Sequence, residues 1–243
     1  YMQRTYVRLR SKYDNSVCHS LEYYVADYAL AQMAERLGHK EDAKALRNRA
    51  QGYKKYYSAE TRTLRPITTD GKFLSPFGPL QGENFGACPG FHEGTAWNYS
   101  FAVPYDVPGM VKLWGGKQRF VQCLQDVFDK GYYDPTNEPN IGYPYIFSQI
   151  KGEEWRTQRL TRDLLAKHFS TKTNGLPGND DTGTMSAWAI FAMIGIYPDT
   201  PGLPVYTFTA PVFDKVTIHL DPKYFPQSKL VINAPGAANQ NAY

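Results

Sequence analysis

Two adjacent carboxylates in a glycine-rich turn, Asp180 and Asp181, are the residues of this chain best placed for acid–base chemistry. Apolar side chains recur at helical spacing directly after this turn, which predicts that a helix begins there: Met185, Trp188, Ala189, Ala192 and Met193. A helix N-terminus stabilises negative charge, so a carboxylate at this place stays ionised at neutral pH and suits a general base. The alternative is a helix cap, which contributes about 1 kcal/mol to stability.

Two further segments contain an acid among aromatic and turn residues, around Glu93 (91–99, FHEGTAWNY) and Glu138 (134–140, DPTNEPN). Glycoside hydrolysis needs one carboxyl group that donates a proton and one carboxylate that activates water or attacks carbon. Neighbouring aromatic rings would desolvate Glu93 and keep it protonated: Phe91, Trp97 and Tyr99. We therefore expect Glu93 to be the acid and Asp181 the base.

Other readings of these segments remain open. His92 is a competing acid, a substrate contact or a structural histidine. Glu138 lies between Asn137 and the Pro139–Asn140 pair, and oxygen-bearing side chains in a turn are the ligands that calcium prefers. A turn with an Asx cap explains the same residues. The spacing does not match an EF-hand, so a metal site would have to be assembled from separate loops.

Composition narrows the class of protein. The 243 residues suffice for one large or two small domains, and the net charge of +4 is dispersed, so we predict no nucleic-acid partner. The only basic cluster is near the start of the chain: Arg4, Arg8, Arg10 and Lys12.

No apolar run approaches the roughly 20 residues that span a bilayer. The three cysteines fit neither a disulfide framework nor a zinc site: Cys18, Cys88 and Cys123. Aromatic residues make up 15% and either stack on ligands such as sugars or fill a core.

The predicted elements are mostly helices in pairs. Residues 20–37 and 40–57 predict an antiparallel helical hairpin, whereas 61–94 is rich in proline and glycine and predicts a long folded loop. Further helices are expected over 97–114 (interrupted by Pro104 and Pro108), 120–128, 143–150, 156–169 and 185–195, with strands at 216–220 and 229–232. This pattern favours part of an α/α toroid over 1–204, with an active site where its long loops meet, followed by a β-rich tail over 205–243.

Four ordered segments resemble glycoside hydrolase family 92, the calcium-dependent exo-acting α-mannosidases. Residues 92–109 (HEGTAWNYSFAVPYDVPG) are similar to the family signature EGNAWQYSFFVPHDVPG, and 178–188 (GNDDTGTMSAW) to GNEDCGQMSAWY. Residues 137–139 match the NEP turn, and 21–33 (LEYYVADYALAQM) resemble the helix LEYAYDDWCIAQMA. The resemblance covers almost the whole chain in the right order.

The resemblance implies the C-terminal half of an (α/α)6 catalytic domain, normally preceded by a β-sandwich domain. We therefore expect that domain, and the N-terminal region of the same protein, to be absent from this chain, which begins at Tyr1. It implies an inverting, calcium-assisted release of terminal α-linked mannose from N-glycans or mannan, in a secreted or periplasmic protein.

The resemblance also implies roles for individual residues. Glu93 matches the acid, Asp181 the base and Asp180 an accessory acid. Glu138 would hold a calcium ion that grips the terminal mannose, with Asn98 and Asn137 as further ligands. Contacts with substrate are implied for His92, Trp97, Asp106 and Asn179.

Several positions depart from the family pattern. Asn98 replaces a common glutamine, Tyr105 a histidine and Ala26 an aspartate, and some relatives have aspartate at Asn179. Asn98 also begins a glycosylation sequon, but its place inside the signature favours a buried side chain. Two alternatives to an α-mannosidase follow: another α/α-toroid glycosidase, or a glycan-binding relative or inactive fragment without catalysis.

Overall fold

The computed structural model describes residues 2–11, 14–82 and 89–239, so Lys12 and Cys88 lie outside the described residues. The chain forms two compact units, one of Tyr1–Tyr143 with Thr200–Val205 and the other of Pro144–Asp199 with Tyr206–Tyr243. The described residues are mainly helical with short two-stranded sheets, as predicted. The predicted division at residue 204 does not coincide with these units and stays a prediction.

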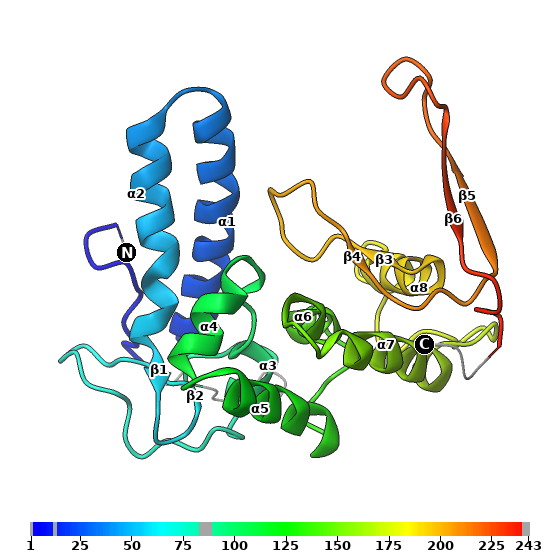
Figure 1. The fold of residues 1–243 in the computed structure, drawn as a ribbon. Coiled ribbons are helices and arrows are strands. Elements are labelled where there is room, and N and C mark those ends of the chain that lie inside the picture. Colours follow the sequence, from blue (N-terminus) through cyan, green and yellow to red (C-terminus); the bar gives the residue numbers. More distant parts are fainter. Residues whose placement is uncertain (1, 12–13, 83–88, 240–243) are drawn as a thin grey trace. The chain divides into compact units, whose positions relative to one another are not determined.

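The first unit begins with the predicted helical hairpin (Figure 1). Helix α1 spans Ser16–Arg36 and α2 spans Lys40–Ala50, and the 3-10 helix η1 (Gln51–Lys55) extends α2. Gly38 joins the two helices with a φ of +84°, a backbone conformation that glycine adopts without a steric penalty. Gly52 lies so close to the partner helix that a Cβ there would be 2.5 Å from the Tyr24 hydroxyl oxygen.

The long loop after this hairpin contains a short sheet that the sequence did not reveal. Strands β1 (Tyr57–Ser58) and β2 (Thr63–Leu64) pair antiparallel. Two residues per strand are too few for an alternating pattern to be recognised. The rest of the predicted loop contains only isolated β-bridges in its described part.

Short helices replace the single interrupted helix predicted over 97–114. The elements are α3 (Ala96–Tyr99), the 3-10 helix η2 (Pro104–Asp106) and α4 (Val107–Leu113). Proline lacks the amide hydrogen that a helix interior needs, so Pro104 and Pro108 stand at helix starts. Helix α5 (Lys117–Asp129) and the 3-10 helix η3 (Glu138–Asn140) follow.

Aromatic side chains form the core beneath these short helices. The Phe101 ring is 5.4 Å from Trp114, 5.5 Å from Phe120 and 5.5 Å from Tyr143, between centroids. All four side chains are buried. Part of the high aromatic content therefore fills a core, which fixes the loops that α3 and η3 anchor.

The second unit contains the remaining helices and the β tail. Its elements are α6 (Tyr143–Ile146, which begins at the boundary), η4 (Phe147–Gln149), α7 (Glu154–His168), α8 (Thr184–Ile194), β3 (Ile196–Tyr197), β4 (Thr207–Phe208), β5 (Lys215–His219) and β6 (Lys229–Asn233). The predicted tail strands pair antiparallel with Thr217 opposite Val231. Trp188 of α8 stacks on Phe169 at 5.3 Å. Of the described helices, none is both long and apolar enough to cross a membrane.

Candidate active site

Glu93 stands in the turn just before α3, in a backbone conformation that is uncommon for its residue type. Its φ is +48°, in the left-handed region, and Gly94 follows it. Such a conformation costs a non-glycine residue of order 1 kcal/mol and persists only where neighbours hold it. The Glu93 side chain is 31% exposed, so its carboxyl group is open to solvent on one side.

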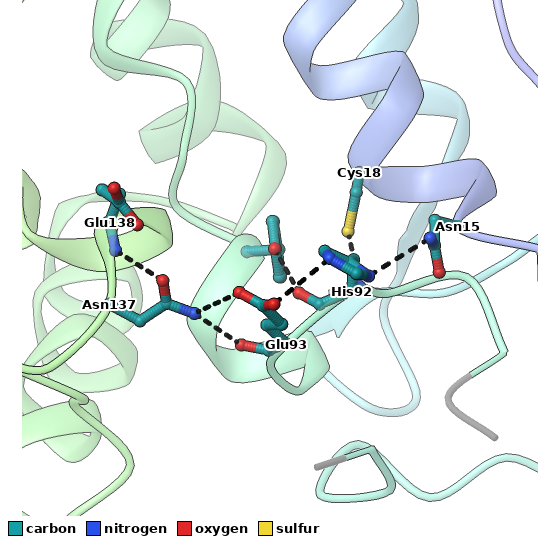
Figure 2. A network of polar contacts seen from close by, with 7 residues as sticks. Asn15, Cys18, His92, Glu93, Asn137 and Glu138 are labelled. Atoms are coloured by element: carbon teal, nitrogen blue, oxygen red, sulfur yellow. Dashed lines mark hydrogen bonds and ion pairs between the residues drawn. The ribbon is translucent and has the colours of Figure 1, made fainter. Parts of the chain in front are cut away.

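Contacts on both sides of the turn hold this peptide in place (Figure 2). The His92 N–H donates to Cys18 Sγ at 3.1 Å, and the Tyr99 hydroxyl donates to the His92 carbonyl oxygen. Burial raises the pKa of the Tyr99 phenol well above its ordinary value, so this hydroxyl stays protonated and remains a donor. The Asn137 amide Nδ2 donates to the Glu93 carbonyl oxygen at 3.1 Å.

Polar side chains flank the Glu93 carboxyl group. His92 Nε2 is 3.4 Å from Oε1, and Asn137 Nδ2 donates to Oε2 at 3.3 Å. The Asn15 amide nitrogen lies 3.4 Å from His92 Nδ1, which as a donor leaves the imidazole proton on Nε2, facing Glu93. Figure 2 shows the series Asn15, His92, Glu93 and Asn137.

The aromatic rings expected to desolvate Glu93 pack against other aromatic rings. The rings of Phe91 and Tyr99 lie 5.8 Å apart, and the Trp97 ring is 5.3 Å from Tyr132. Phe91 is 1% exposed and belongs to the core. Two hydrogen-bonding side chains, His92 and Asn137, thus contact the Glu93 carboxyl group, and its desolvation by the aromatic rings stays a prediction.

A cavity of about 460 Å³ opens beside Glu93. This volume falls within the range of small-molecule sites. Its lining combines loop backbone, polar groups and aromatic side chains: Leu80, Gly82, Glu93, Gly94, Thr95, Asn98, Gly131, Tyr132, Tyr133 and Asp134. The acid candidate therefore borders a space with room for a ligand.

Asn98, a predicted metal ligand, is part of the scaffold. Its Oδ1 accepts hydrogen bonds from the Thr95 N–H at 2.8 Å and the Thr95 hydroxyl at 2.9 Å, which forms a capping box at the start of α3. Its Nδ2 donates to the Tyr132 carbonyl oxygen at 2.9 Å. The side chain is buried, as expected from the sequence, but its oxygen faces two donors and is not open to a cation.

The contacts of Glu138 and Asn137, the other two predicted metal ligands, also do not form a metal site. The Glu138 side chain is exposed and has no hydrogen-bond or ion-pair partner within the described part of the chain. Asn137 caps η3, since its Oδ1 accepts from the Glu138 N–H at 3.1 Å, which is the Asx cap that the sequence offered as the alternative to a metal site. Across residues 2–11, 14–82 and 89–239, no three histidine, cysteine, aspartate or glutamate side chains gather closely enough to hold a metal ion.

Asp106, a predicted substrate contact, also has partners within the fold. It caps α4 by accepting from the Gly109 N–H at 3.0 Å, and it accepts from the Tyr53 hydroxyl at 2.8 Å. Lys54 Nζ lies 3.5 Å away. A Cβ at Gly109 would approach Asp106 Oδ2 to 2.2 Å, so glycine is needed at the first turn of α4. These contacts give Asp106 a scaffold role, and its predicted contact with substrate stays a prediction.

In the second unit, the two adjacent aspartates differ in their environment. The Asp180 carboxylate accepts from the Ser186 N–H at 2.8 Å and from the Ser186 hydroxyl at 2.9 Å, so it caps the start of α8. Asp181 is exposed, and its carboxylate has no partner among the described residues. Its φ of +45° begins a left-handed run with Thr182 and Gly183, and Gly183 is the residue that directly precedes α8.

The capping and catalytic interpretations of this turn thus fall on different residues. Asp180 performs the capping role, while Asp181 precedes the helix with an open carboxylate. Asn179, the neighbouring predicted substrate contact, is also exposed. The helix itself spans Thr184–Ile194 with Gly195 as its C-cap, close to the range that the spacing of its apolar residues predicted.

Two residues of the Glu93 network, Asn15 and Cys18, were not predicted. They lie 77 and 74 positions from His92 in sequence. Asn15 looks like an ordinary helix cap, yet its side chain makes no cap hydrogen bond and contacts His92 instead. No local motif identifies such a long-range partner.

Comparison with known proteins gives a consistent result. A sequence model described as the glycosyl hydrolase family 92 catalytic domain matches residues 1–243. A solved family 92 α-mannosidase from Bacteroides thetaiotaomicron, in complex with mannoimidazole, is 28% identical with a TM-score of 0.87, over 96% of this chain and 32% of that chain. An inverting family 92 mannosidase from Bacteroides thetaiotaomicron VPI-5482 is 26% identical with a TM-score of 0.84, over 97% of this chain and 34% of that chain.

A curated relative is more distant. An uncharacterized secreted glycosidase from Arthroderma benhamiae is 32% identical over 127 residues, which are 52% of this chain and 16% of that protein. The chain thus spans about a third of the two solved structures and less of this relative. The predicted fold class, part of an (α/α)6 toroid with a short β tail, is confirmed by the likeness to the solved structures.

Proposed function

The chain belongs to glycosyl hydrolase family 92, and from this membership we propose that the protein is an exo-acting α-mannosidase. Its substrates are terminal α-linked mannose residues of N-glycans or mannan. The observation that most supports this proposal is the Glu93 carboxyl group, which borders a cavity and is flanked by His92 and Asn137. The choice of sugar is supported by two similar structures, which are those of an α-mannosidase and a mannosidase.

The proposed mechanism inverts the anomeric carbon. Glu93 donates its proton to the glycosidic oxygen as the bond from that oxygen to C1 breaks. Asp181 removes a proton from a water molecule whose oxygen forms the new bond to C1 from the opposite face. The exposed, unpartnered carboxylate of Asp181 at the head of α8 supports its role as base. Asp180 supports it as an accessory acid that fixes the turn through Ser186.

Calcium is part of the proposal, although the three predicted ligands do not form a site by themselves. Calcium takes about 6–8 oxygen ligands. Of the three, only Glu138 offers an open carboxylate, because the side-chain oxygens of Asn98 and Asn137 already accept hydrogen bonds. The remaining ligands would come from other groups or from the sugar, and we derive no catalytic step through the metal.

Two further points follow from the family. We propose that the protein is secreted or periplasmic, which the name of the Arthroderma relative as a secreted glycosidase supports. A glycosidase for another sugar and a glycan-binding relative without catalysis are the competing functions. Because Glu93 and Asp181 are both present, the catalytic reading is the better supported.

Hydrolysis assays on the full-length gene product separate these functions. With α-linked manno-oligosaccharides, we expect mannose to be released from the non-reducing end, and proton NMR during the first minutes to show β-mannose as the first anomer formed. α-Mannose as the first product would contradict inversion. Binding of manno-oligosaccharide without hydrolysis, or hydrolysis only of other sugars, would overturn the mannosidase proposal.

A further inference from the structure

Asn137 contacts the candidate acid through one amide group at two places. Its Nδ2 lies 3.1 Å from the Glu93 carbonyl oxygen and 3.3 Å from Glu93 Oε2 (Figure 2). The same side chain accepts from the Glu138 N–H through Oδ1 at 3.1 Å. Asn137 therefore connects the turn that contains Glu93 to the start of η3, 44 positions away in sequence.

The hydrogen bond from Asn137 to the Glu93 carbonyl oxygen stabilises the unusual backbone conformation of Glu93. A glutamate whose backbone is in the left-handed region is strained. A hydrogen bond to its carbonyl oxygen helps to hold the peptide in that conformation. This orientation directs the side chain toward His92 and Asn137, the two groups that contact its carboxyl oxygens.

The second contact limits the rotation of the carboxyl group. The last torsion of a glutamate side chain is broad, so a carboxyl group without partners rotates freely. Here Asn137 contacts Oε2 while His92 Nε2 faces Oε1 at 3.4 Å, which leaves few orientations. A general acid needs a carboxyl group with a fixed orientation, because a small misplacement of a catalytic group greatly reduces the rate.

We propose that Asn137 is a positioning residue for Glu93, an inference that rests on the proposed function. It fixes the carboxyl group so that its proton points to the glycosidic oxygen. Asn137 therefore raises turnover only of substrates whose leaving group must be protonated. Asn137 thus acts through Glu93 and not as a calcium ligand, the role that the sequence first indicated.

Two variants separate positioning from the other roles of this side chain. Asn137→Asp keeps the oxygen that caps η3 and replaces the amide donor by a carboxylate oxygen that repels Glu93. Asn137→Ala removes both the cap and the donor. If Asn137 were a calcium ligand, the aspartate variant would bind calcium at least as well as the unmodified protein, because carboxylates are strong calcium ligands.

The test compares two substrates on the full-length gene product. An α-linked manno-oligosaccharide needs acid assistance, whereas 2,4-dinitrophenyl α-mannoside has a leaving group that departs unprotonated. We expect Asn137→Asp to lower kcat on the oligosaccharide by about 10- to 100-fold, a fraction of the effect of a general acid. On the dinitrophenyl substrate kcat should change by less than about threefold, with KM and the calcium concentration for half-maximal activity unchanged on both.

Three outcomes are informative. Equal loss on both substrates, no loss on either, or a calcium requirement that Asn137→Asp lowers or raises would each overturn the positioning role. If the unmodified protein hydrolyses neither substrate, the proposed function itself fails. Thermal unfolding of both variants serves as the fold control. If Asn137→Ala is unfolded, the kinetics of Asn137→Asp alone test the proposal, because that variant keeps the oxygen that caps η3.

Discussion

Asp180 and Asp181 are adjacent in sequence, yet the fold gives them different tasks. The Asp180 carboxylate accepts a hydrogen bond from the Ser186 N–H at the start of α8, whereas the Asp181 carboxylate is exposed to solvent. The backbone is left-handed at Asp181, Thr182 and Gly183, directly after Asp180, so the chain changes direction between the two carboxylates and α8. The two residues therefore allow separate experiments on catalysis and on stability.

Asp181→Asn should abolish most activity without unfolding the protein. As the proposed base, Asp181 activates the attacking water, and loss of a general base lowers kcat by about 10²- to 10⁴-fold. Water must attack with every leaving group, so manno-oligosaccharide and 2,4-dinitrophenyl α-mannoside should lose turnover alike. Steady-state kinetics check this, and a variant with nearly full kcat would exclude Asp181 as the base.

Asp180→Ala should act mainly on stability. It removes the hydrogen bonds to the Ser186 N–H and hydroxyl, and loss of a helix cap costs about 0.5–2 kcal/mol. Asp163→Ala is the matched control, because Asp163 is exposed on α7 and its one ion pair among the described residues is with Arg159 at 3.4 Å. Calorimetry should show a lower Tm for the first variant and almost none of that change for the second. Equal Tm values would argue against the cap.

At the scale of elements, short helices rather than long ones present the site. Glu93 precedes the four-residue helix α3, and Glu138 begins the three-residue helix η3. Such short helices have little stability of their own. Side-chain caps hold them instead, from Thr95 and Asn98 in α3 and from Asn137 in η3.

Asp106 offers a test of this scaffold in the neighbouring helix α4. Burial, and then the hydrogen bond to Asp106, raise the pKa of the Tyr53 phenol well above its ordinary value, so Tyr53 stays a donor. Asp106→Ala leaves this buried hydroxyl without its acceptor and removes the cap, at a cost of about 1–3 kcal/mol. We expect a lower Tm, and a smaller loss when Tyr53→Phe is already present. Additive losses in the double variant would contradict the coupling.

The sequence predicted the elements better than the contacts between them. Hydrophobic spacing identified the hairpin of α1 and α2, the helix α8 and the paired tail strands, because each element is long enough for its apolar residues to show a period. It missed β1 with β2 and β3 with β4, whose strands are only two residues long.

Local sequence indicates candidate site residues, but it does not indicate which groups contact them in the fold. Acidic residues in turns made Glu93, Glu138 and the aspartate pair candidates from local sequence, and their catalytic and metal-binding roles stay predictions. The functions of amide side chains depend on which groups face them in the fold, and the amide nitrogens of Asn98 and Asn137 donate to groups 34 and 44 positions away in sequence. Asn98 and Asn137 have the right chemistry for a metal, but in the fold their oxygens accept hydrogen bonds from the backbone or from Thr95.

At the scale of the whole molecule, the proposed acid and base belong to different compact units. Glu93 is in the unit of Tyr1–Tyr143, and Asp181 is in that of Pro144–Asp199. Inversion needs both carboxyl groups, about 6.5–9.5 Å apart, on opposite faces of one sugar. The mechanism therefore depends on how the full-length protein assembles these units.

Removal of calcium tests the metal at this scale. Because Glu138 provides only one open ligand, we expect a site that shares its cation with other groups and releases it to a chelator. EDTA should abolish mannose release, and added calcium should restore it, whereas magnesium should not. Hydrolysis that continues unchanged in EDTA would remove calcium from the proposal.

The role of Glu93 as the acid is the central claim, and the kinetics of Glu93→Gln test it most directly. Glutamine keeps the shape of the side chain but has no proton to donate. We predict that kcat on manno-oligosaccharide falls by about 10²- to 10⁴-fold, while 2,4-dinitrophenyl α-mannoside retains most of its turnover because its leaving group needs no proton. Unchanged turnover of the oligosaccharide, or an equal loss on both substrates, would contradict the account.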